Sequence, residues 1–305
     1  MEFSALLRSQ LAFFKPFVNG CSLATTRAGQ DKLGELITLT RRTKVTYRKH
    51  HFSGFCAEWI TPRQLTRRGV ILYLHGGGYV AGNLEYAKGF GTVLAERYGI
   101  RVFCPAYRLA PEFPFPAAVE DACESFEYLL NCGFLPQEIL LAGESAGGGL
   151  IFSLCLARKG QHKSLPAGIL AISPWSDLTA SGTSYIENKE KDPSMSLERL
   201  NFYANCYTKD RTNPLVSPLF GDLTGLPPCR IFVGGDEIML DDARLLHQKL
   251  LDSNVDSKLT VSEGMWHGYL LYGIRETKPD FEQIGTWLGK VLFYHGTKTS
   301  VDETR

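Results

Sequence analysis

Short apolar runs alternate with amphipathic helical patterns from Gly69 to the C-terminal part of the chain, and this alternation constrains the fold more than any other feature. One helical pattern is the apolar series Val119, Ala122, Phe126 and Leu129. Nearly continuous apolar strands need a covering layer on each side. The alternation therefore predicts an α/β protein with a mostly parallel sheet and helices on both faces. The apolar runs are Val70–Leu74, Val102–Pro105, Ile139–Ala142, Ile169–Ile172, Ile231–Val233 and Lys258–Val261.

The region before this alternation has a different pattern. The first forty residues are helix-prone, with a break at Pro16 and Asn19–Gly20. Two extended runs follow, Lys44–His50 and Phe55–Ile60, and the residues Ser53 and Gly54 between them favour a turn. The two runs are typical of an antiparallel hairpin.

One interval interrupts the alternation. Almost sixty residues separate the run that ends at Ile172 from the run that begins at Ile231, which is too long for a simple crossover between strands. We expect this interval to contribute an insertion that, together with the N-terminal helices, forms a cap. The expected division is an N-terminal cap segment 1–43, a core of 44–174 and 212–295, a cap insertion 175–211 and a tail 296–305.

Charge and composition narrow the classes of function. The chain has 33 Lys and Arg against 32 Asp and Glu, a net charge of +1 that favours neither nucleic acid nor anionic membranes as a partner. With 44% hydrophobic and 21% charged residues, the composition is that of a globular protein with a sizeable core. We therefore expect a small-molecule substrate.

The N-terminus and the cysteines predict the compartment. The first residues, MEFSALLRSQLAFFKPF, lack the features of a signal peptide, and no apolar stretch approaches the ~18 residues of a membrane span. The eight cysteines include no C-x-x-C pair, which favours unpaired thiols in a reducing environment over a disulfide framework. The expectation is a cytoplasmic protein.

The motif with the most specific chemistry is Gly143–Gly147, which reads Gly-Glu-Ser-Ala-Gly. It directly follows one apolar run and directly precedes the helical run Leu150–Ala157. A serine in a sharp strand-to-helix turn stands exposed, and the N-terminus of the helix behind it favours a developing negative charge. This placement favours Ser145 as a nucleophile over the alternative that the glycines only form a flexible loop.

A second glycine-rich motif, His-Gly-Gly-Gly-Tyr at His75–Tyr79, follows the first apolar run. Successive glycines let backbone N–H groups turn toward a bound oxygen, as an oxyanion hole requires. The alternative is a phosphate-binding loop, but the motif has neither of the usual phosphate-loop spacings. We expect the oxyanion donors to be the N–H groups of Gly77, Gly78 and Ala146.

A serine nucleophile needs a base, and the base needs a carboxylate that orients it. Of the seven histidines, His267 fits best, because it lies in a glycine-flanked loop just after the last apolar run. Asp236 is the preferred acid because it lies closest to the end of a predicted strand, with Asp241 and Asp242 as alternatives. The chain order Ser145, Asp236, His267 is that of α/β-hydrolases.

Over roughly residues 69 to 292 the sequence resembles the hormone-sensitive-lipase-like (family IV) carboxylesterases, and it is similar to epsilon-lactone hydrolases. The segments that carry the resemblance are His75–Asn83, Tyr107–Glu112, Pro116–Asp121, Gly143–Gly148, Ser173–Leu178 and Gly264–Gly268. The resemblance implies the α/β-hydrolase fold with about eight strands, a helical cap, and no metal or organic cofactor. It also implies that Ser145 is the nucleophile, Asp236 the acid and His267 the base, with the amides of Gly77, Gly78 and Ala146 as oxyanion donors.

Two positions depart from the family's pattern. Glu144 precedes the nucleophile where many members have Asp or Thr, and we expect this longer carboxylate to perturb nearby hydrogen bonds without removing the chemistry. After Asp236 the chain reads Glu-Ile-Met-Leu-Asp-Asp, where the family often has Asp-Pro-Leu-x-Asp, and this difference keeps the alternatives for the acid open.

The resulting hypothesis is a serine carboxylesterase that hydrolyses short- to medium-chain acyl esters, of about two to eight carbons, through a covalent acyl-enzyme. A lactonase, amidase or acyltransferase with the same triad remains open, because these differ in the acceptor and in the shape of the cap. A non-catalytic receptor on the same fold is the alternative from another class. The resemblance also suggests a homodimer through the last strand, Lys258–Val261.

Overall fold

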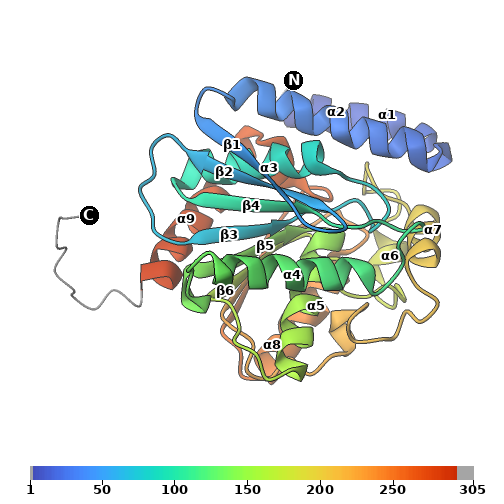
Figure 1. The fold of residues 1–305 in the computed structure, drawn as a ribbon. Helices are drawn as coiled ribbons and strands as arrows, with labels where there is room; N and C mark the ends of the chain where they lie inside the picture. The colour runs from blue at the N-terminus through green and yellow to red at the C-terminus, as the bar shows by residue number, and fades with distance from the viewer. Residues whose placement is uncertain (1–2, 294–305) are drawn as a thin grey trace, which may run out of the picture.

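The computed structural model describes residues 3–293, and an eight-stranded sheet forms its centre in the order β1-β2-β4-β3-β5-β6-β7-β8 (Figure 1). The strands are β1 (Val45–His51), β2 (Cys56–Pro62), β3 (Val70–Leu74), β4 (Arg101–Ala106), β5 (Ile139–Glu144), β6 (Gly168–Ile172), β7 (Cys229–Gly234) and β8 (Ser257–Ser262). Strand β2 pairs antiparallel with both β1 and β4, and all other neighbouring strands are parallel. The carboxyl ends of the parallel strands therefore all lie on the same side of the sheet.

Helices cover both faces of this sheet, as the alternating pattern predicted (Figure 1). The helices are α1 (Phe3–Gly20), α2 (Leu23–Arg41), α3 (Leu84–Tyr98), α4 (Ala117–Asn131), α5 (Ala146–Gly160), α6 (Ser184–Glu187), α7 (Leu197–Tyr207), α8 (Leu240–Asp252) and α9 (Lys278–Phe293). Successive side chains of a strand point to opposite faces. On β3, Leu72 packs in the cluster that contains α4, α5 and α8, whereas Ile71 and Tyr73 pack with α3 and α9. The expectation of a mostly parallel α/β sheet is confirmed.

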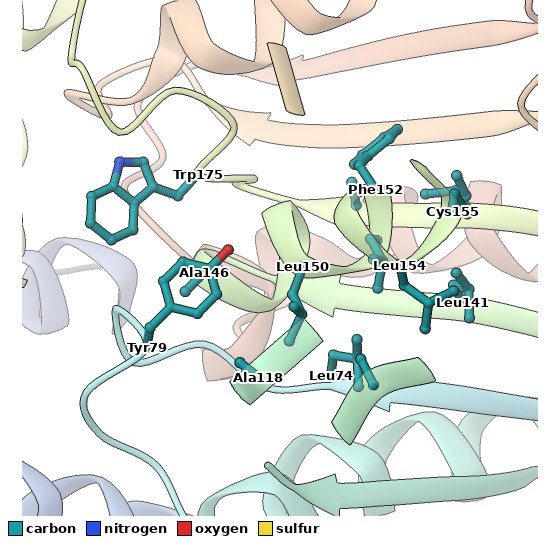
Figure 2. Close-up of a cluster of buried hydrophobic side chains, with 14 of the residues drawn as sticks. Leu74, Tyr79, Ala118, Leu141, Ala146, Leu150, Phe152, Leu154, Cys155 and Trp175 are labelled. Carbon is teal, nitrogen blue, oxygen red and sulfur yellow. The ribbon is translucent and has the colours of Figure 1, made fainter. Parts of the chain in front are cut away.

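The buried cluster beneath α5 supports the start of that helix. Figure 2 shows Leu74 and Leu141 from the strands close to Leu150 and Leu154 of α5. All four side chains are fully buried. Dense packing on this side holds the junction between β5 and α5 in one position.

The predicted N-terminal hairpin is confirmed. Strands β1 and β2 pair from Val45 opposite Pro62 to His51 opposite Cys56. The Phe52 N–H donates to the Phe55 carbonyl at 2.9 Å and closes the turn. The hairpin extends the parallel sheet by two antiparallel strands at one edge.

The N-terminal helices lie beside the segment that connects β6 to β7 (Figure 1). Arg8 of α1 donates to the Lys191 carbonyl at 2.6 Å, and Lys15 donates to the Asp192 carbonyl at 2.6 Å. Helix α2 crosses α3 so closely that a Cβ on Gly89 would lie 2.9 Å from the Cα of Gly34. The N-terminal helices therefore pack against a segment from the middle of the chain, between β6 and β7.

All eight cysteines lie in the described part of the chain and are free thiols. Of the helices within residues 3–293, none is both long enough and apolar enough to cross a membrane.

Candidate active site

Ser145 occupies the sharp turn between β5 and α5 that the motif predicted. Its backbone has φ 54° and ψ −122°, a conformation that residues other than glycine rarely adopt. The Ser145 N–H donates to the Ile172 carbonyl at 2.9 Å, and its carbonyl accepts from the Trp175 N–H at 2.9 Å. A side chain on Gly147 would collide with the Leu74 carbonyl, so the turn needs a glycine there. The neighbouring strands thus hold a strained serine in place, as nucleophile turns require.

The carboxylate that is hydrogen-bonded to the predicted base, His267, belongs to Glu237. His267 Nδ1 lies 2.9 Å from Glu237 Oε2, and the side chain of Glu237 is fully buried. Glu237 Oε1 accepts from the Ser173 hydroxyl at 2.6 Å and from the Gly234 N–H at 2.5 Å. Ser173 in turn accepts from the Gly268 N–H at 3.1 Å. Three donors therefore orient one carboxylate, and Ser173 links it to the loop that carries the histidine.

The prediction that Asp236 contacts the base is wrong. Its carboxylate pairs with Arg8 of α1 at 2.7 Å, and its N–H donates to the Met265 carbonyl at 3.0 Å. The chain turns tightly after β7, so that the side chain at 236 faces the N-terminal helix. The longer side chain at 237 folds back over the end of β7, where it accepts the Gly234 N–H.

The two alternative acids also have other partners. Asp241 accepts from the Ser184 N–H at 2.9 Å, at the start of α6. Asp242 is buried and accepts from the N–H groups of Ser176 and Asp177, each at 3.0 Å. Both carboxylates anchor loops of the segment that follows β6.

The environment of His267 sets its protonation. Burial lowers the pKa of His267, but the hydrogen bond and the charge of Glu237 outweigh it, and the pKa is raised above 6.5. A neutral imidazole that donates from Nδ1 to Glu237 has its lone pair on Nε2. That lone pair is the group that a serine base needs.

The glycine loop after β3 is oriented by hydrogen bonds to its carbonyl groups. The Gly76 carbonyl lies 2.7 Å from His75 Nδ1, and the Gly77 carbonyl accepts from the N–H groups of Val80 and Ala81 at 3.1 and 3.0 Å. In a trans peptide the carbonyl and the following N–H point in opposite directions. These bonds therefore turn the N–H groups of Gly77 and Gly78 the other way. Both residues have positive φ, 103° and 64°, which glycine adopts without strain.

Nucleophile, base and glycine loop border one cavity of about 460 Å³. Ser145, His267, Gly77 and Gly78 all line it, and Ala146 begins the helix directly behind the serine. Most of the remaining wall is apolar. It comes from the N-terminal helices and from the segment between β6 and β7, and it includes Leu11, Phe14, Leu33, Met195, Leu200 and Tyr203.

The structure thus brings together Ser145, His267, Gly77, Gly78 and Ala146 from the sequence prediction and leaves out Asp236. Sequence reasoning missed Glu237 and its support, Ser173. The available signal was the position of Glu237, which lies shortly after β7 (Cys229–Gly234) and one residue beyond the aspartate that was preferred.

Comparison with known proteins agrees with this architecture. Residues 71–271 match a family model described as the alpha/beta hydrolase fold. An acetyl-hydrolase of Streptomyces hygroscopicus is 39% identical over 224 residues, which cover 71% of this chain and 74% of that protein. An esterase of Acinetobacter venetianus is 34% identical over 212 residues, which cover 68% and 70%.

Solved structures show the same relationship. An esterase from the bacterial hormone-sensitive lipase family superposes with a TM-score of 0.87 at 35% identity and covers 93% of this chain and 98% of its own. The structure of EstE5 soaked with p-nitrophenyl butyrate has a TM-score of 0.84 at 32% identity, with coverage of 92% and 98%. The sheet order, the serine turn and these matches agree that this chain belongs to the hormone-sensitive-lipase-like carboxylesterases of the α/β-hydrolase superfamily.

Proposed function

We propose that this carboxylic ester hydrolase works through a triad of Ser145, His267 and Glu237 and a covalent acyl-enzyme. The observation that carries the proposal is the buried pair of Glu237 and His267, whose histidine lines the same cavity as the strained serine. Glu237 takes the role that the sequence assigned to Asp236. The family relationship supports ester hydrolysis, and the geometry supports these residues as its agents.

The chemistry follows from the protonation of the base. Glu237 accepts the Nδ1 proton of His267, so that Nε2 is free to take the proton of the Ser145 hydroxyl as its oxygen attacks the ester carbonyl. The carbonyl π electrons move to the oxygen, and the resulting oxyanion accepts from the N–H groups of Gly77, Gly78 and Ala146. The bond to the alcohol breaks as the oxyanion collapses, and His267 gives the alcohol its proton.

The second half repeats these steps with water. His267 takes a proton from water as the water oxygen attacks the acyl carbon of the ester on Ser145. Collapse of the second oxyanion releases the acid and returns the proton to Ser145. The helix that begins at Ala146 adds a positive dipole end at the site of both oxyanions.

The cavity supports short to medium acyl chains. Its volume of about 460 Å³ lies toward the lower end of the range for small-molecule pockets, about 300–1,000 Å³. We propose that residues 1–43 and 175–211 form the cap, because both segments supply apolar wall, for example Leu33 and Leu200. EstE5, a structural neighbour, was soaked with a four-carbon acyl ester, p-nitrophenyl butyrate.

Initial rates on p-nitrophenyl acetate, butyrate, octanoate and palmitate test the proposal, with wild type beside Ser145→Ala. We expect activity on the shorter esters that disappears in the variant. Higher activity on palmitate than on butyrate would contradict the proposed chain length. Equal activity of Ser145→Ala, purified free of other esterases, would contradict the mechanism. A matched lactone, a matched amide and an added alcohol acceptor separate the esterase from a lactonase, an amidase and an acyltransferase.

Assembly is a separate proposal. Strand β8 is the edge of the sheet, and the side chains of Ser257–Ser262 are at least partly exposed. An edge strand with free backbone groups is a ready site for pairing with a second copy. Light scattering after size-exclusion chromatography is expected to show a dimer of wild type and a monomer when Val261 is replaced by Pro.

A further inference from the structure

Glu144, the residue before the nucleophile, has a fully buried carboxylate that three donors surround. Its Oε1 accepts from the Gly76 N–H at 2.6 Å and from the Tyr86 hydroxyl at 3.1 Å. Its Oε2 accepts from the Tyr73 hydroxyl at 2.5 Å. Within residues 3–293 none of its hydrogen-bond partners is a cation, so these three donors are what opposes the cost of burying its charge. Such an arrangement is costly for a residue with only a packing role.

The contact with Gly76 reaches the oxyanion loop. The peptide between His75 and Gly76 is held at both ends, since its carbonyl accepts from the Tyr107 hydroxyl at 2.7 Å and its N–H donates to Glu144. The next peptide along the chain carries the Gly77 N–H. The space between loop and turn is also filled, because a Cβ on Gly76 would lie 3.0 Å from the Cβ of Ser145.

We propose that Glu144 is a positioning residue whose carboxylate fixes the oxyanion loop at Gly76 against the nucleophile turn. The proposal rests on the proposed function, because it assigns Gly77 and Gly78 as donors to the oxyanion. Glu144 connects the oxyanion loop to the nucleophile turn. The relative position of this loop and this turn decides how well the donors reach the reacting oxygen. A donor that is displaced loses most of its effect, since oxyanion stabilisation depends on preorganised geometry.

The charge of Glu144 also acts on the base. Burial raises the pKa of Glu144 to about 7, and the hydrogen bonds from Tyr73, Gly76 and Tyr86 oppose that rise. The negative charge of Glu144 contributes to raising the pKa of His267. Within residues 3–293, the ionisable groups that interact with Glu144 by hydrogen bond or charge are Tyr73 on β3, Tyr86 on α3, Cys104 on β4, Tyr107 after β4 and His267.

Two substitutions separate the hydrogen bond from the charge. In Glu144→Gln the amide oxygen can still accept the Gly76 N–H, and the amide N–H₂ can donate to the Tyr73 hydroxyl oxygen. This variant keeps the link to the loop and removes the charge. Glu144→Ala removes both, and it leaves the Gly76 N–H without its acceptor.

The probes report the oxyanion loop directly. A fluorophosphonate reacts with the serine, and a phenylboronic acid forms a tetrahedral adduct on it, so both place an oxygen where the oxyanion develops. Neither probe requires knowledge of the natural ester. Asp242→Asn is the matched control, because Asp242 is also a buried carboxylate that accepts two backbone N–H groups, but it anchors the loop at Ser176.

We expect Glu144→Ala to lower kcat and the boronate affinity by about 10- to 100-fold each, less than the 10²–10³ of a deleted oxyanion donor, with little change in KM. Glu144→Gln is expected to keep both within about fivefold, because its amide oxygen can still accept the Gly76 N–H. Asp242→Asn is expected to lower Tm without changing the boronate affinity.

Unchanged fluorophosphonate rate and boronate affinity in folded Glu144→Ala would overturn the proposal and leave the proposed function intact. The same holds if Glu144→Gln loses as much boronate affinity as Glu144→Ala, because its amide oxygen keeps the link to the Gly76 N–H. If wild-type Ser145 takes up no fluorophosphonate, the proposed function itself fails, and with it the assignment of an oxyanion loop. Should Glu144→Ala not fold, Tyr73→Phe tests the same link, because it removes one of the donors that hold Glu144; wild-type boronate affinity there would also overturn the proposal.

Discussion

Replacement of Glu237 by Gln tests the assignment of the triad with almost no change in shape. Glu237 Oε1 faces two donors, the Ser173 hydroxyl and the Gly234 N–H, and the latter can only donate. The amide oxygen of a glutamine must therefore occupy the Oε1 position, which leaves its N–H₂ group against His267 Nδ1. To accept that bond, the imidazole must carry its proton on Nε2. In that tautomer it cannot take the proton of Ser145.

The expected loss is large. An acid-to-amide change that imposes the wrong tautomer in a serine triad lowers kcat by about 10⁴, which corresponds to about 5.4 kcal/mol at 1.36 kcal/mol for each factor of ten. Asp236→Asn is the neighbouring control. It disrupts only the pair with Arg8, whose side chain is 33% exposed. A pair of that kind contributes on the order of 1 kcal/mol or less, so kcat is expected to stay within a few-fold.

The assay is single-turnover and steady-state hydrolysis of p-nitrophenyl butyrate by wild type and both variants, with thermal melts to verify folding. Activity of Glu237→Gln within about tenfold of wild type would refute the tautomer argument. A loss of orders of magnitude in Asp236→Asn, with Glu237→Gln little affected, would return the role to the residue that the sequence favoured.

The remaining predictions concern the supports of the site. The raised pKa of His267 means that kcat/KM falls with decreasing pH around a midpoint above 6.5, because the imidazolium cannot accept a proton; a pH–rate profile checks this, and a midpoint below 6.5 contradicts it. Ser173→Ala leaves the Gly268 N–H without an acceptor and is expected to lower the free energy of unfolding by about 1–3 kcal/mol and kcat with it, as urea titration and kinetics would show; wild-type values for both would disprove the link. Gly78→Ala is expected to abolish activity, because its φ of 64° strains any residue with a Cβ and the added Cβ would collide with the Tyr203 ring. Measurement of kcat, together with a thermal melt that verifies folding, tests this, and a near-normal kcat would contradict it. Arg8→Ala is expected to raise KM more than it lowers kcat, since α1 supplies wall to the cavity, and kinetics on butyrate and octanoate esters would test this against a pure loss of kcat.

Much of the fold was predictable because its signals are local and repeated. The central parallel strands β3, β5 and β6 are buried and apolar along most of their length, and the covering helices carry apolar stripes, so that the layers follow from these patterns. The turns of the hairpin and of the nucleophile depend on a few residues with restricted conformations, such as Ser53–Gly54 and Gly143–Gly147. The order of the strands in the sheet was not predicted by these patterns, since it depends on contacts between segments far apart in the chain.

The proposed acid of the triad was missed because two neighbouring carboxylates follow β7. Proximity to the strand end favoured Asp236 in the sequence prediction. The structure favours Glu237 because its side chain is longer. The Gly234 N–H faces back toward the turn, and only the longer arm of Glu237 bonds this group while reaching His267. No periodic pattern shows which of two adjacent acids folds inward. The partner of the other acid, Arg8, lies more than two hundred residues earlier in the chain.

The position of Arg8 connects the N-terminal helix to the loop of the base. The same guanidinium that pairs with Asp236 also donates to the Gly264 carbonyl at 2.8 Å, at the start of the loop that leads to His267. It further donates to the Lys191 carbonyl in the segment between β6 and β7. One side chain thus joins both wall segments of the cavity to the loop of the base. The Glu237 carboxylate is held separately, by Ser173 and by the Gly234 N–H, and it shares none of these contacts with Arg8. Two adjacent residues of one turn therefore have separate partners: Asp236 connects to the N-terminal helix, which supplies cavity wall, and Glu237 connects to the proposed base.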